Sequence, residues 1–285
     1  MTYFELWKWG EKRLADAGVA DASLDARYLL LEAFEMDMAH FLLKEQEQVP
    51  ATEGRTREYS GAIQARAARV PLQYLTGKQD FMGLTFHVDE RVLIPRQDTE
   101  TLVELVLKEN TDKKARILDL CTGSGCIAVS LAVLGGYRKV DAVDISEDAL
   151  AAAEENGTRL GGKVRFLKSD LFSALDPEKK YDIITSNPPY IPTEVLNGLE
   201  PEVKDYEPRM ALDGSEDGLA FYRRIAVAAP AFLRAGGRIY LEIGYDQGAA
   251  VEELLRNNGF ARTRVVKDAA GRDRVVCAEL PGIGE

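Results

Sequence analysis

The chain has 285 residues, which is long enough for about two domains with buried cores. Hydrophobic residues make up 46% and charged residues 29%, a balance typical of globular proteins that excludes wholesale disorder. The formal net charge of −11 excludes proteins that hold duplex DNA through phosphate contacts alone, because such binding needs clustered cations. We therefore expect no direct sequence-specific binding of nucleic acid.

The cysteines, histidines and apolar segments argue against a metal centre and a membrane location. The three cysteines form no CxxC pair and are expected to be free thiols: Cys121, Cys126 and Cys277. Because the chain has only two histidines besides, we predict no metal site. The longest nearly apolar stretch, residues 127–137, is well short of the ~20 residues that span a bilayer. Glu5 follows the start too soon for the apolar core of a signal peptide. We expect a cytoplasmic protein without membrane contact.

Residues 1–70 are expected to be helical. Thr2 and Glu5 match a capping box, and apolar residues then recur at helical spacing as far as Gly18. Asp21 is expected to cap a second helix, and a short apolar segment follows at residues 38–43. Thr52 is expected to open a longer helix that runs toward residue 70, where Pro71 follows. This region contains no obvious catalytic cluster.

Residues 71–97 differ in character and are interpreted as a linker that contains a hairpin. Residues 79–82 and 84–88 alternate like strands around Gly83, which is typical of a tight turn. Asp98 or Thr99 is then expected to cap a helix whose apolar positions continue to Leu107.

From Ala115 onward, short apolar strands alternate with helical segments, and Ser146 is expected to cap one of the helices. The predicted strands are residues 117–120, 140–145, 164–167, 181–185 and 238–243, and a terminal hairpin follows at residues 262–266 and 274–279. This alternation predicts an α/β fold with a doubly wound, mostly parallel sheet.

The first motif that carries chemistry is Asp119-Leu-Cys-Thr-Gly-Ser-Gly125, which follows a predicted strand and opens a helix. Its glycines let the backbone approach a ligand, and the helix N-terminus offers free N–H groups. Asp144 ends the next strand, where a carboxylate can bind both hydroxyls of a ribose. The pattern fits a dinucleotide, and it also fits S-adenosylmethionine.

The second motif, Asn187-Pro188-Pro189-Tyr190, follows the fourth predicted strand. The prolines fix φ and remove two N–H donors, so carbonyl groups stay available. The Asn187 side-chain oxygen and the Pro188 carbonyl can both accept hydrogen bonds from one planar NH2 group, and Tyr190 offers a flat face for that group. This arrangement favours methyl transfer to an amide or aromatic amine over hydride transfer.

Together these motifs resemble methyltransferases that act on amino groups, and two further segments narrow the resemblance. Pro71-Leu-Gln-Tyr-Leu-Thr-Gly77 and Leu93-Ile-Pro-Arg-Gln-Asp-Thr-Glu100 are similar to segments of the HemK/PrmC family, which methylates a glutamine side chain in peptide chain release factors. In that family the glutamine lies in a Gly-Gly-Gln loop. The resemblance covers nearly the whole chain, although Cys121 stands where the family often has glycine and Gln97 where it often has proline.

The resemblance implies a small helical substrate-recognition domain at residues 1–70, a hairpin linker at 71–97 and a methyltransferase domain at 98–285. The last would contain a seven-stranded Rossmann-like sheet that ends in an antiparallel hairpin. The cofactor would be S-adenosyl-L-methionine, with S-adenosyl-L-homocysteine as product, and the partner a release factor. We expect the protein to be a monomer.

The resemblance also assigns roles to residues. Cofactor binding is assigned to Arg96, Glu100, Cys121, Thr122, Gly123, Ser124, Gly125, Asp144, Asp170, Leu171, Phe172 and Asn187. Asn187, Pro188, Pro189 and Tyr190 would bind the substrate amide, and Asn187, Pro188 and Tyr190 would be catalytic. The helices before residue 70 would select the partner, because the proposed cofactor-binding and amide-binding residues all lie beyond residue 90.

Four alternatives share part of this pattern. A glutamine methyltransferase of a ribosomal protein would differ mainly in its partner. An adenine-N6 methyltransferase on nucleic acid would share Asn-Pro-Pro-Tyr, but it needs a cationic groove that the net charge disfavours. A nicotinamide-dependent oxidoreductase is supported by the glycine turn alone. A noncatalytic binding module leaves the tetrapeptide unexplained.

Overall fold

The computed structural model describes residues 1–50 and 53–282, which form two compact units. The first, here called the helical unit, contains Met1–Lys78 and a later segment, Glu200–Tyr206. The second, here called the sheet unit, contains Gln79–Leu199 and the chain from residue 207 onward. The chain therefore leaves the sheet unit once and returns to it within a few residues.

The helical unit begins with the capping box that the sequence predicts. Thr2 accepts a hydrogen bond from the Glu5 amide at 3.1 Å, and the Glu5 carboxylate accepts one from the Thr2 amide at 2.9 Å. A second helix does begin after Asp21, but Asp21 makes no side-chain cap hydrogen bond, so this part of the prediction is wrong. The helices are α1 (Tyr3–Asp16), α2 (Ala22–Ala33), α3 (Met38–Lys44), α4 (Glu53–Ala67), α5 (Leu72–Thr76) and α9 (Pro201–Lys204).

Helix α4 ends at Ala67, before residue 70, and Thr52, predicted to open it, lies outside the described residues. The late segment is bound to the helical unit by ion pairs. Arg66 contacts Asp25 at 2.7 Å and Glu202 at 2.9 Å, and Arg69 contacts Glu202 at 2.6 Å. The Arg66 and Asp25 side chains are buried, so Arg66 needs its ionic partners. Its pairing with Glu202 therefore attaches residues 200–206 to the helical unit.

The predicted hairpin is confirmed as a two-stranded sheet of β1 (Lys78–Phe81) and β2 (Leu84–His87). Met82 and Gly83 both have positive φ, at 53° and 72°, which forms the tight turn between the strands. Phe81 and Phe86 pack edge to face with ring centroids 6.0 Å apart, so the two strands share a buried aromatic contact.

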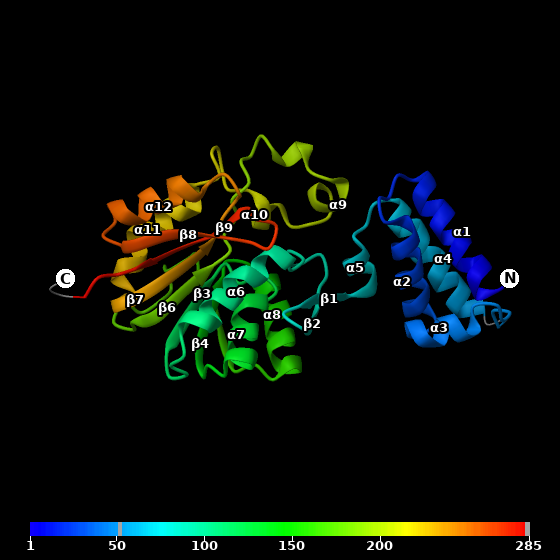
Figure 1. Cartoon of the computed structure of the whole chain (residues 1–285), viewed down its shortest axis with the longest axis horizontal. Helices are drawn as coiled ribbons and strands as arrows, with labels where there is room; N and C mark the ends of the chain where they lie inside the picture. The colour runs from blue at the N-terminus through cyan, green and yellow to red at the C-terminus, as the bar shows by residue number, and fades with distance from the viewer. Residues whose placement is uncertain (51–52, 283–285) are drawn as a thin grey trace. The chain divides into compact units, whose positions relative to one another are not determined.

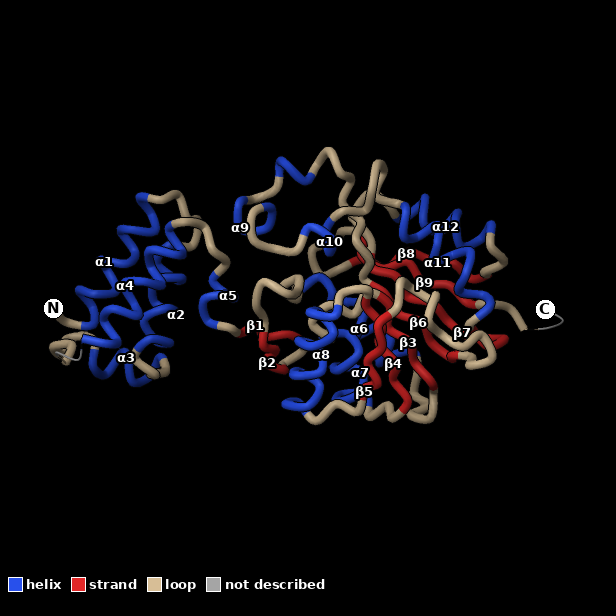
Figure 2. Tube along the Cα trace, turned by 180° about the vertical axis from the view of Figure 1, so that it is seen from behind, coloured by secondary structure: helices blue, strands red, loops and turns tan. Residues whose placement is uncertain are grey.

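The sheet unit contains a seven-stranded sheet in the order β5-β4-β3-β6-β7-β9-β8, which confirms the predicted fold class (Figures 1 and 2). The strands are parallel except β9, which runs antiparallel to both neighbours as the predicted terminal hairpin requires. Their bounds are β3 (Arg116–Leu120), β4 (Lys139–Asp144), β5 (Val164–Lys168), β6 (Tyr181–Ser186), β7 (Leu233–Glu242), β8 (Ala261–Lys267) and β9 (Asp273–Glu279).

Helices cover both faces of this sheet. One face contacts α6 (Gln97–Glu109), α7 (Cys126–Gly135) and α8 (Glu147–Leu160), and the other packs on α11 (Ala220–Ala228) and α12 (Gly248–Asn257). Ser146 caps α8 as predicted, by accepting a hydrogen bond from the Ala149 amide at 3.2 Å. Helix α6 begins at Gln97, and neither Asp98 nor Thr99 caps it, so that prediction is wrong.

Residues 191–219 contain elements that periodicity does not predict. They comprise η1 (Leu196–Gly198), α9 and α10 (Arg209–Leu212), each too short to repeat an apolar spacing. A further short turn, η2 (Ala229–Ala231), leads into β7. The part of this segment that belongs to the sheet unit directly follows the Asn-Pro-Pro-Tyr motif, so it forms the surroundings of that motif.

Candidate active site

Strand register aligns the candidate residues along the carboxyl edge of the sheet. Leu120 of β3 pairs with Val143 of β4 and with Ser186 of β6, and Ser186 pairs with Leu241 of β7. The next residue of each strand therefore occupies the same edge, in the order Asp144, Cys121, Asn187 and Glu242. Neighbouring strands lie about 4.8 Å apart, so the glycine turn and the Asn-Pro-Pro-Tyr motif are adjacent. Parallel sheets bind ligands at such carboxyl edges.

The glycine turn after β3 has the open backbone expected of a ligand-binding loop. Gly123 and Gly125 have φ of 54° and 80°, and Cys121 adopts the same left-handed region at 56°. A Cβ placed on Gly123 would meet no atom within 4 Å, whereas one on Gly125 would lie 3.1 Å from the Ala153 Cβ. Gly125 therefore allows close packing on α8, and Gly123 leaves open space above the turn.

Asp119 is a buried hub beneath this turn. Its carboxylate accepts hydrogen bonds from Thr122 and from Thr185, each at 2.7 Å, and so joins the turn to β6. Burial raises the pKa of Asp119 to about 7, against the two hydroxyl donors. Asp119 thus fixes the turn from below.

Asp144, predicted to bind a ribose, lies at the end of β4 and supports the same turn. Its two oxygens accept hydrogen bonds from the Gly123 amide at 2.9 Å and the Ser146 amide at 3.0 Å. Burial raises the pKa of Asp144, whereas these amide donors lower it. An ionised carboxylate has capacity for further donors, so ribose hydroxyls could be bound there as well.

Two residues of the sheet unit, Asn156 and Glu100, hold the hairpin by hydrogen bonds, and Asn156 also contacts the glycine turn. Asn156 of α8 exchanges hydrogen bonds with the backbone of His87, at 2.8 and 3.0 Å, and also donates to the Ser124 carbonyl at 3.1 Å. Glu100 of α6 accepts a hydrogen bond from the Met82 amide at 2.6 Å. The hairpin therefore has a fixed place in the sheet unit, and Glu100 orders its turn.

The Asn-Pro-Pro-Tyr motif follows β6, and the NH2 end of the Asn187 amide already has a hydrogen-bond partner. The Nδ2 of Asn187 donates to the Thr99 hydroxyl at 3.3 Å, which leaves Oδ1 without a partner among residues 1–50 and 53–282. The Tyr190 hydroxyl donates to Glu242 at 3.4 Å. Burial raises the pKa of Tyr190, so this tyrosine stays neutral.

Two glycines and a glutamine hold the end of the motif. The Gln247 amide donates to the carbonyls of Tyr190 and Gly218, at 3.0 and 3.3 Å. A Cβ on Gly214 would lie 2.7 Å from the Tyr190 Cα, and one on Gly218 would lie 2.3 Å from the Tyr190 carbonyl oxygen. Only glycine permits this approach.

We expect Gly218→Ala to destabilise the protein and to displace Tyr190. The left-handed φ of 72° costs an alanine roughly 1–2 kcal/mol, and the clash with the carbonyl adds roughly 1–3 kcal/mol. Gly271→Ala is a matched control, because its φ is 79° but no atom lies within 4 Å. Urea unfolding of both variants measures the difference. Equal stability losses would show that the close approach to Tyr190 costs nothing.

The three residues predicted to bracket the adenine lie together after β5 but differ in surroundings. Asp170 pairs with Arg224 at 2.8 Å near the surface. Leu171 has a φ of 51° and is buried. Phe172 is buried in the core, where it stacks on Phe232 with ring centroids 4.7 Å apart. Their contact with adenine stays a prediction.

Arg96 has a defined partner, and the Cys121 thiol is shielded from solvent. Arg96 binds both oxygens of the buried Glu207, at 2.6 and 2.8 Å, so it anchors the chain just before α10. Burial raises the pKa of the Cys121 thiol, which therefore stays neutral. Neither observation tests the predicted role of Arg96 and Cys121 in cofactor binding.

The sequence reasoning missed two polar residues of this edge, Thr99 and Glu242. Glu242 ends β7 and is 1% exposed, and Thr99 is 2% exposed in the first turn of α6. Burial raises the pKa of Glu242 to about 7, while hydrogen bonding from Thr99 and the charge of Arg274 lower it. A carboxylate at the end of the apolar run Ile-Tyr-Leu in a predicted strand is the signal that could have found it.

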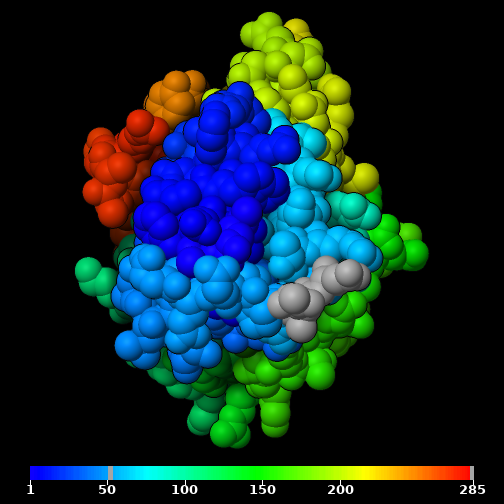
Figure 3. Space-filling view, turned by 90° about the vertical axis from the view of Figure 1, so that its right-hand side faces the viewer, coloured from blue at the N-terminus to red at the C-terminus, as the bar shows by residue number. Residues whose placement is uncertain are grey.

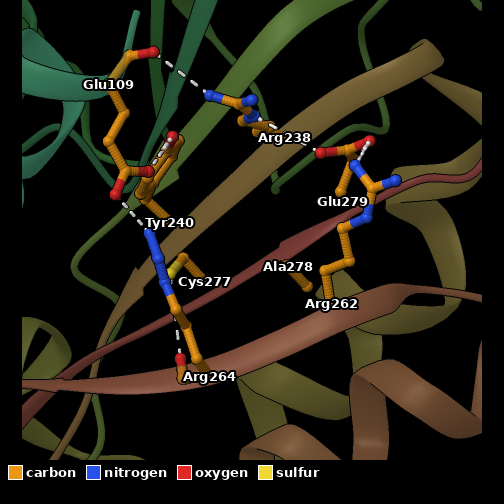
Figure 4. A pocket seen from close by; sticks show the side chains of 8 residues that line it. All are labelled: Glu109, Arg238, Tyr240, Arg262, Arg264, Cys277, Ala278 and Glu279. Carbon is orange, nitrogen blue, oxygen red and sulfur yellow. Dashed lines mark hydrogen bonds and ion pairs between the residues drawn. The ribbon is translucent and has the colours of Figure 1, made fainter.

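Two pockets lie in the sheet unit. One has a volume of about 740 Å³ and is lined by residues of the segment that follows the Asn-Pro-Pro-Tyr motif: Thr193, Glu194, Asn197, Arg209, Met210, Asp213, Ser215, Glu216 and Phe221. The other, of about 400 Å³, lies over β7, β9 and β8, where Arg238, Arg262 and Arg264 face Glu109 and Glu279 (Figure 4). Arg262 contacts Glu279 at 3.0 Å, and Arg264 pairs with Glu109. Neither of these pockets is lined by any of the predicted site residues.

Within the described ranges, no group of three or more His, Cys, Asp or Glu side chains is arranged to hold a metal ion. In the same residues, no helix is both long and apolar enough to cross a bilayer.

Comparisons with known proteins agree with this architecture. Residues 5–77 match the family model described as the PrmC N-terminal domain, and residues 97–197 match the methyltransferase small domain. A curated release factor glutamine methyltransferase of Geobacter sulfurreducens is 41% identical over 268 residues, covering 94% of this chain and 93% of the relative. The chain belongs to the release factor glutamine methyltransferase family.

A second member of this family, from Moorella thermoacetica, is 46% identical over 272 residues and covers 94% of each chain. The crystal structure of a methyltransferase from Pyrococcus furiosus superposes with a TM-score of 0.53 at 19% identity, covering 78% of this chain and 98% of that one. The latter likeness shows the methyltransferase fold. The family predicted from the motifs is confirmed.

Proposed function

We propose that this chain transfers a methyl group from S-adenosylmethionine to the side-chain amide nitrogen of the glutamine in the Gly-Gly-Gln motif of peptide chain release factors. The observation that carries the proposal is the Asn-Pro-Pro-Tyr loop beside an open glycine turn, with the Asn187 Oδ1 left for a substrate NH2 group. Family membership supports the same reaction, because the curated relatives are named for it.

The glycine turn fits the cofactor on this structure's own features. A Cβ on Gly123 would meet no atom within 4 Å, and the Asp144 carboxylate accepts a hydrogen bond from the Gly123 amide at 2.9 Å. We propose that residues 121–125, Asp144 and residues 170–172 bind the cofactor. When bound, S-adenosylmethionine supplies an electrophilic methyl group, so no covalent enzyme intermediate is needed.

The residues of the motif act on the nucleophile. An amide nitrogen shares its lone pair with its carbonyl group and is therefore a poor nucleophile. The Asn187 Oδ1 and the Pro188 carbonyl would accept both amide hydrogens and stabilise the positive charge that builds on nitrogen. The Tyr190 ring would fix the plane of the amide. Holding reactants in an aligned geometry can lower a barrier by about 7–11 kcal/mol.

The experiment that tests the function is incubation of the protein with purified release factor and labelled cofactor, followed by mass mapping of the modified residue. A single methyl group on the glutamine of Gly-Gly-Gln is the expected result. Parallel incubations with purified ribosomal proteins and with nucleic acid should stay unlabelled, and label on a ribosomal protein or on adenine would instead support one of the two other amino-group methyltransferases. Release factors act in the cytoplasm, and we propose that location for this protein as well.

We also propose that the helical unit selects the partner. Helix α3 exposes Leu42 and Leu43, which are 60% and 81% exposed, on a unit that carries none of the proposed catalytic residues. Figure 3 shows one face of this unit, with α1 in dark blue and the region of α3 in lighter blue. Exposed leucines on one short helix fit the burial of a partner's apolar surface.

We expect the double variant Leu42→Ser and Leu43→Ser to methylate intact release factor poorly. Losing two buried leucines from an interface removes roughly 1.5–3 kcal/mol per side chain, or about 3–6 kcal/mol for the pair, so kcat/KM should fall about a hundredfold or more. Methylation of a short Gly-Gly-Gln peptide should not change. Val227→Ser is the matched control, because Val227 is 68% exposed on α11 of the sheet unit. An unchanged kcat/KM on intact release factor would refute this role.

A further inference from the structure

Two buried residues behind the motif, Thr99 and Glu242, have contacts that determine which way the Asn187 amide faces. An asparagine amide can turn by 180° with almost no change of shape, which exchanges its oxygen and its NH2 group. Only one of the two orientations presents an acceptor to a substrate NH2 group. The other would set two donors against each other, so something in the protein must choose between them.

Thr99 provides the first part of that choice. Its hydroxyl oxygen accepts a hydrogen bond from the Asn187 Nδ2 at 3.3 Å. A hydroxyl has one proton but two lone pairs, so it can present either an acceptor or a donor to Asn187. If its proton is already used elsewhere, only the NH2 end of Asn187 can face it.

Glu242 is the group that can take this proton. It is 1% exposed, and its Oε2 has no hydrogen-bond partner among the residues that the structure describes. Strand register places Glu242 beside Asn187, which contacts Thr99. Val275 of β9 pairs with Glu242, and its neighbour Arg274 holds Asp98, the residue before Thr99, at 2.9 Å. Hydrogen bonding from Thr99 also lowers the pKa of this carboxylate. An ionised carboxylate only accepts hydrogen bonds, so a Thr99 proton turned toward it would leave the Thr99 lone pair for the Asn187 NH2 group.

The same carboxylate also holds the second amide-binding residue. The Glu242 Oε1 accepts a hydrogen bond from the Tyr190 hydroxyl at 3.4 Å. Strand register places Glu242 at the edge directly beside Asn187. One buried group therefore contacts Tyr190 directly and would act on Asn187 through Thr99.

We propose that Glu242 and Thr99 are positioning residues that keep the Asn187 oxygen directed at the substrate amide and hold Tyr190 against it. This inference rests on the proposed function. In this inference neither Glu242 nor Thr99 touches the substrate. They act by fixing the orientation of Asn187 and Tyr190, which do.

The charges around Glu242 make this arrangement of Glu242, Thr99 and Asn187, here called the relay, sensitive to pH. Asp98 of α6, Cys126 of α7, Tyr190, Tyr222 of α11 and Arg274 of β9 are the titratable groups that interact with it. Arg274 pairs with Asp98 at 2.9 Å, which fixes the helix turn that carries Thr99. Burial raises the pKa of Glu242 to about 7, so the carboxyl gains a proton as the pH falls through 7. The protonated group can donate to Thr99 and then no longer dictates the orientation of Asn187.

The test measures kcat with saturating release factor and cofactor for Thr99→Val, Thr99→Ser and Glu242→Gln. Removing the Thr99 hydroxyl or the Glu242 charge should lower kcat about 10- to 100-fold, as expected for a hydrogen bond to a charged group. Thr99→Ser restores the hydroxyl and should recover most of the activity. Thr101→Val is the matched control, because it makes the same chemical change two residues further along α6. Cofactor affinity should be unchanged in every variant.

The pH profile separates positioning from a merely structural role. In the wild type, kcat should rise as the pH increases through about 7, and Glu242→Gln should lack this inflection. Wild-type kcat in both Thr99→Val and Glu242→Gln would overturn the proposal, as would an inflection that survives in Glu242→Gln. If Glu242→Gln fails to fold, Thr99→Val still decides. A wild type that modifies no release factor would refute the proposed function, whereas a wild type that modifies it but is insensitive to these variants refutes only the relay.

Discussion

Asn187→Ala is expected to reduce methyl transfer to release factor by about a hundredfold to a thousandfold, or roughly 2.7–4 kcal/mol in the activation barrier. The substitution removes the Oδ1 acceptor, which no described residue otherwise occupies, and leaves the Thr99 hydroxyl without its donor. A preorganised acceptor costs nothing to align during the reaction, so its loss appears almost entirely in kcat. Single-turnover methylation with saturating release factor measures the effect.

Companion variants separate the acceptor from the shape of the site. Asn187→Asp keeps an acceptor but replaces the Nδ2 donor to Thr99 with a second oxygen, so it should also be impaired. Tyr190→Phe removes only the hydroxyl that contacts Glu242 and should be much milder than Tyr190→Ala, which removes the ring. All variants should bind the cofactor nearly as the wild type does. Near-normal turnover in Asn187→Ala would show that the amide is held by other groups.

The fold could be predicted where local sequence and periodicity decide it. The capping box at Thr2 satisfies its own backbone donors, so it forms regardless of tertiary context. The strands of the sheet unit are short apolar runs bounded by turns, and every predicted one is present. The segment at residues 191–219 could not be predicted, because its short helices are held by contacts with distant residues. Arg96 with Glu207 and Gln247 with Tyr190 are such contacts.

The cap at the start of α6 shows how tertiary contacts can override a local pattern. Thr99 has the side chain of a capping residue, but its hydroxyl accepts a hydrogen bond from Asn187, 88 residues later in the chain. The helix therefore begins at Gln97 without a side-chain cap. Thr99 therefore departs from the capping preference of its own segment. We place it behind the site, and such departures are expected where function and local preference compete.

The candidate site divides in the same way. The glycine turn and the Asn-Pro-Pro-Tyr motif are contiguous in sequence, so their chemistry could be predicted from residue types alone. Glu242 gave a weaker signal, a carboxylate at the end of an apolar strand, and its place beside Asn187 depends on the pairing of Ser186 with Leu241. For Phe172 the sequence predicts the position after β5, but it does not predict that the ring stacks on Phe232.

Asp144→Ala is expected to abolish most of the cofactor affinity while the sheet remains folded. The carboxylate accepts hydrogen bonds from the Gly123 and Ser146 amides, so its loss removes the proposed ribose acceptors and also frees the glycine turn. Charge-assisted hydrogen bonds contribute roughly 1.5–3 kcal/mol, which corresponds to a Kd for S-adenosylmethionine about 10- to 150-fold weaker. Isothermal calorimetry with cofactor measures this directly.

Two further variants assign the cause. Asp144→Asn keeps one oxygen acceptor but replaces the other with a donor, so it can support only one of the two backbone amides and should fall between the wild type and Asp144→Ala. Asp148→Ala is the matched control, because it removes the same charge from an exposed position in the first turn of α8. Its cofactor affinity should equal that of the wild type. If Asp144→Ala is folded and binds the cofactor as tightly as Asp148→Ala does, the carboxylate that ends β4 does not bind the ribose, and the cofactor must be held by the glycine turn and by residues 170–172 instead.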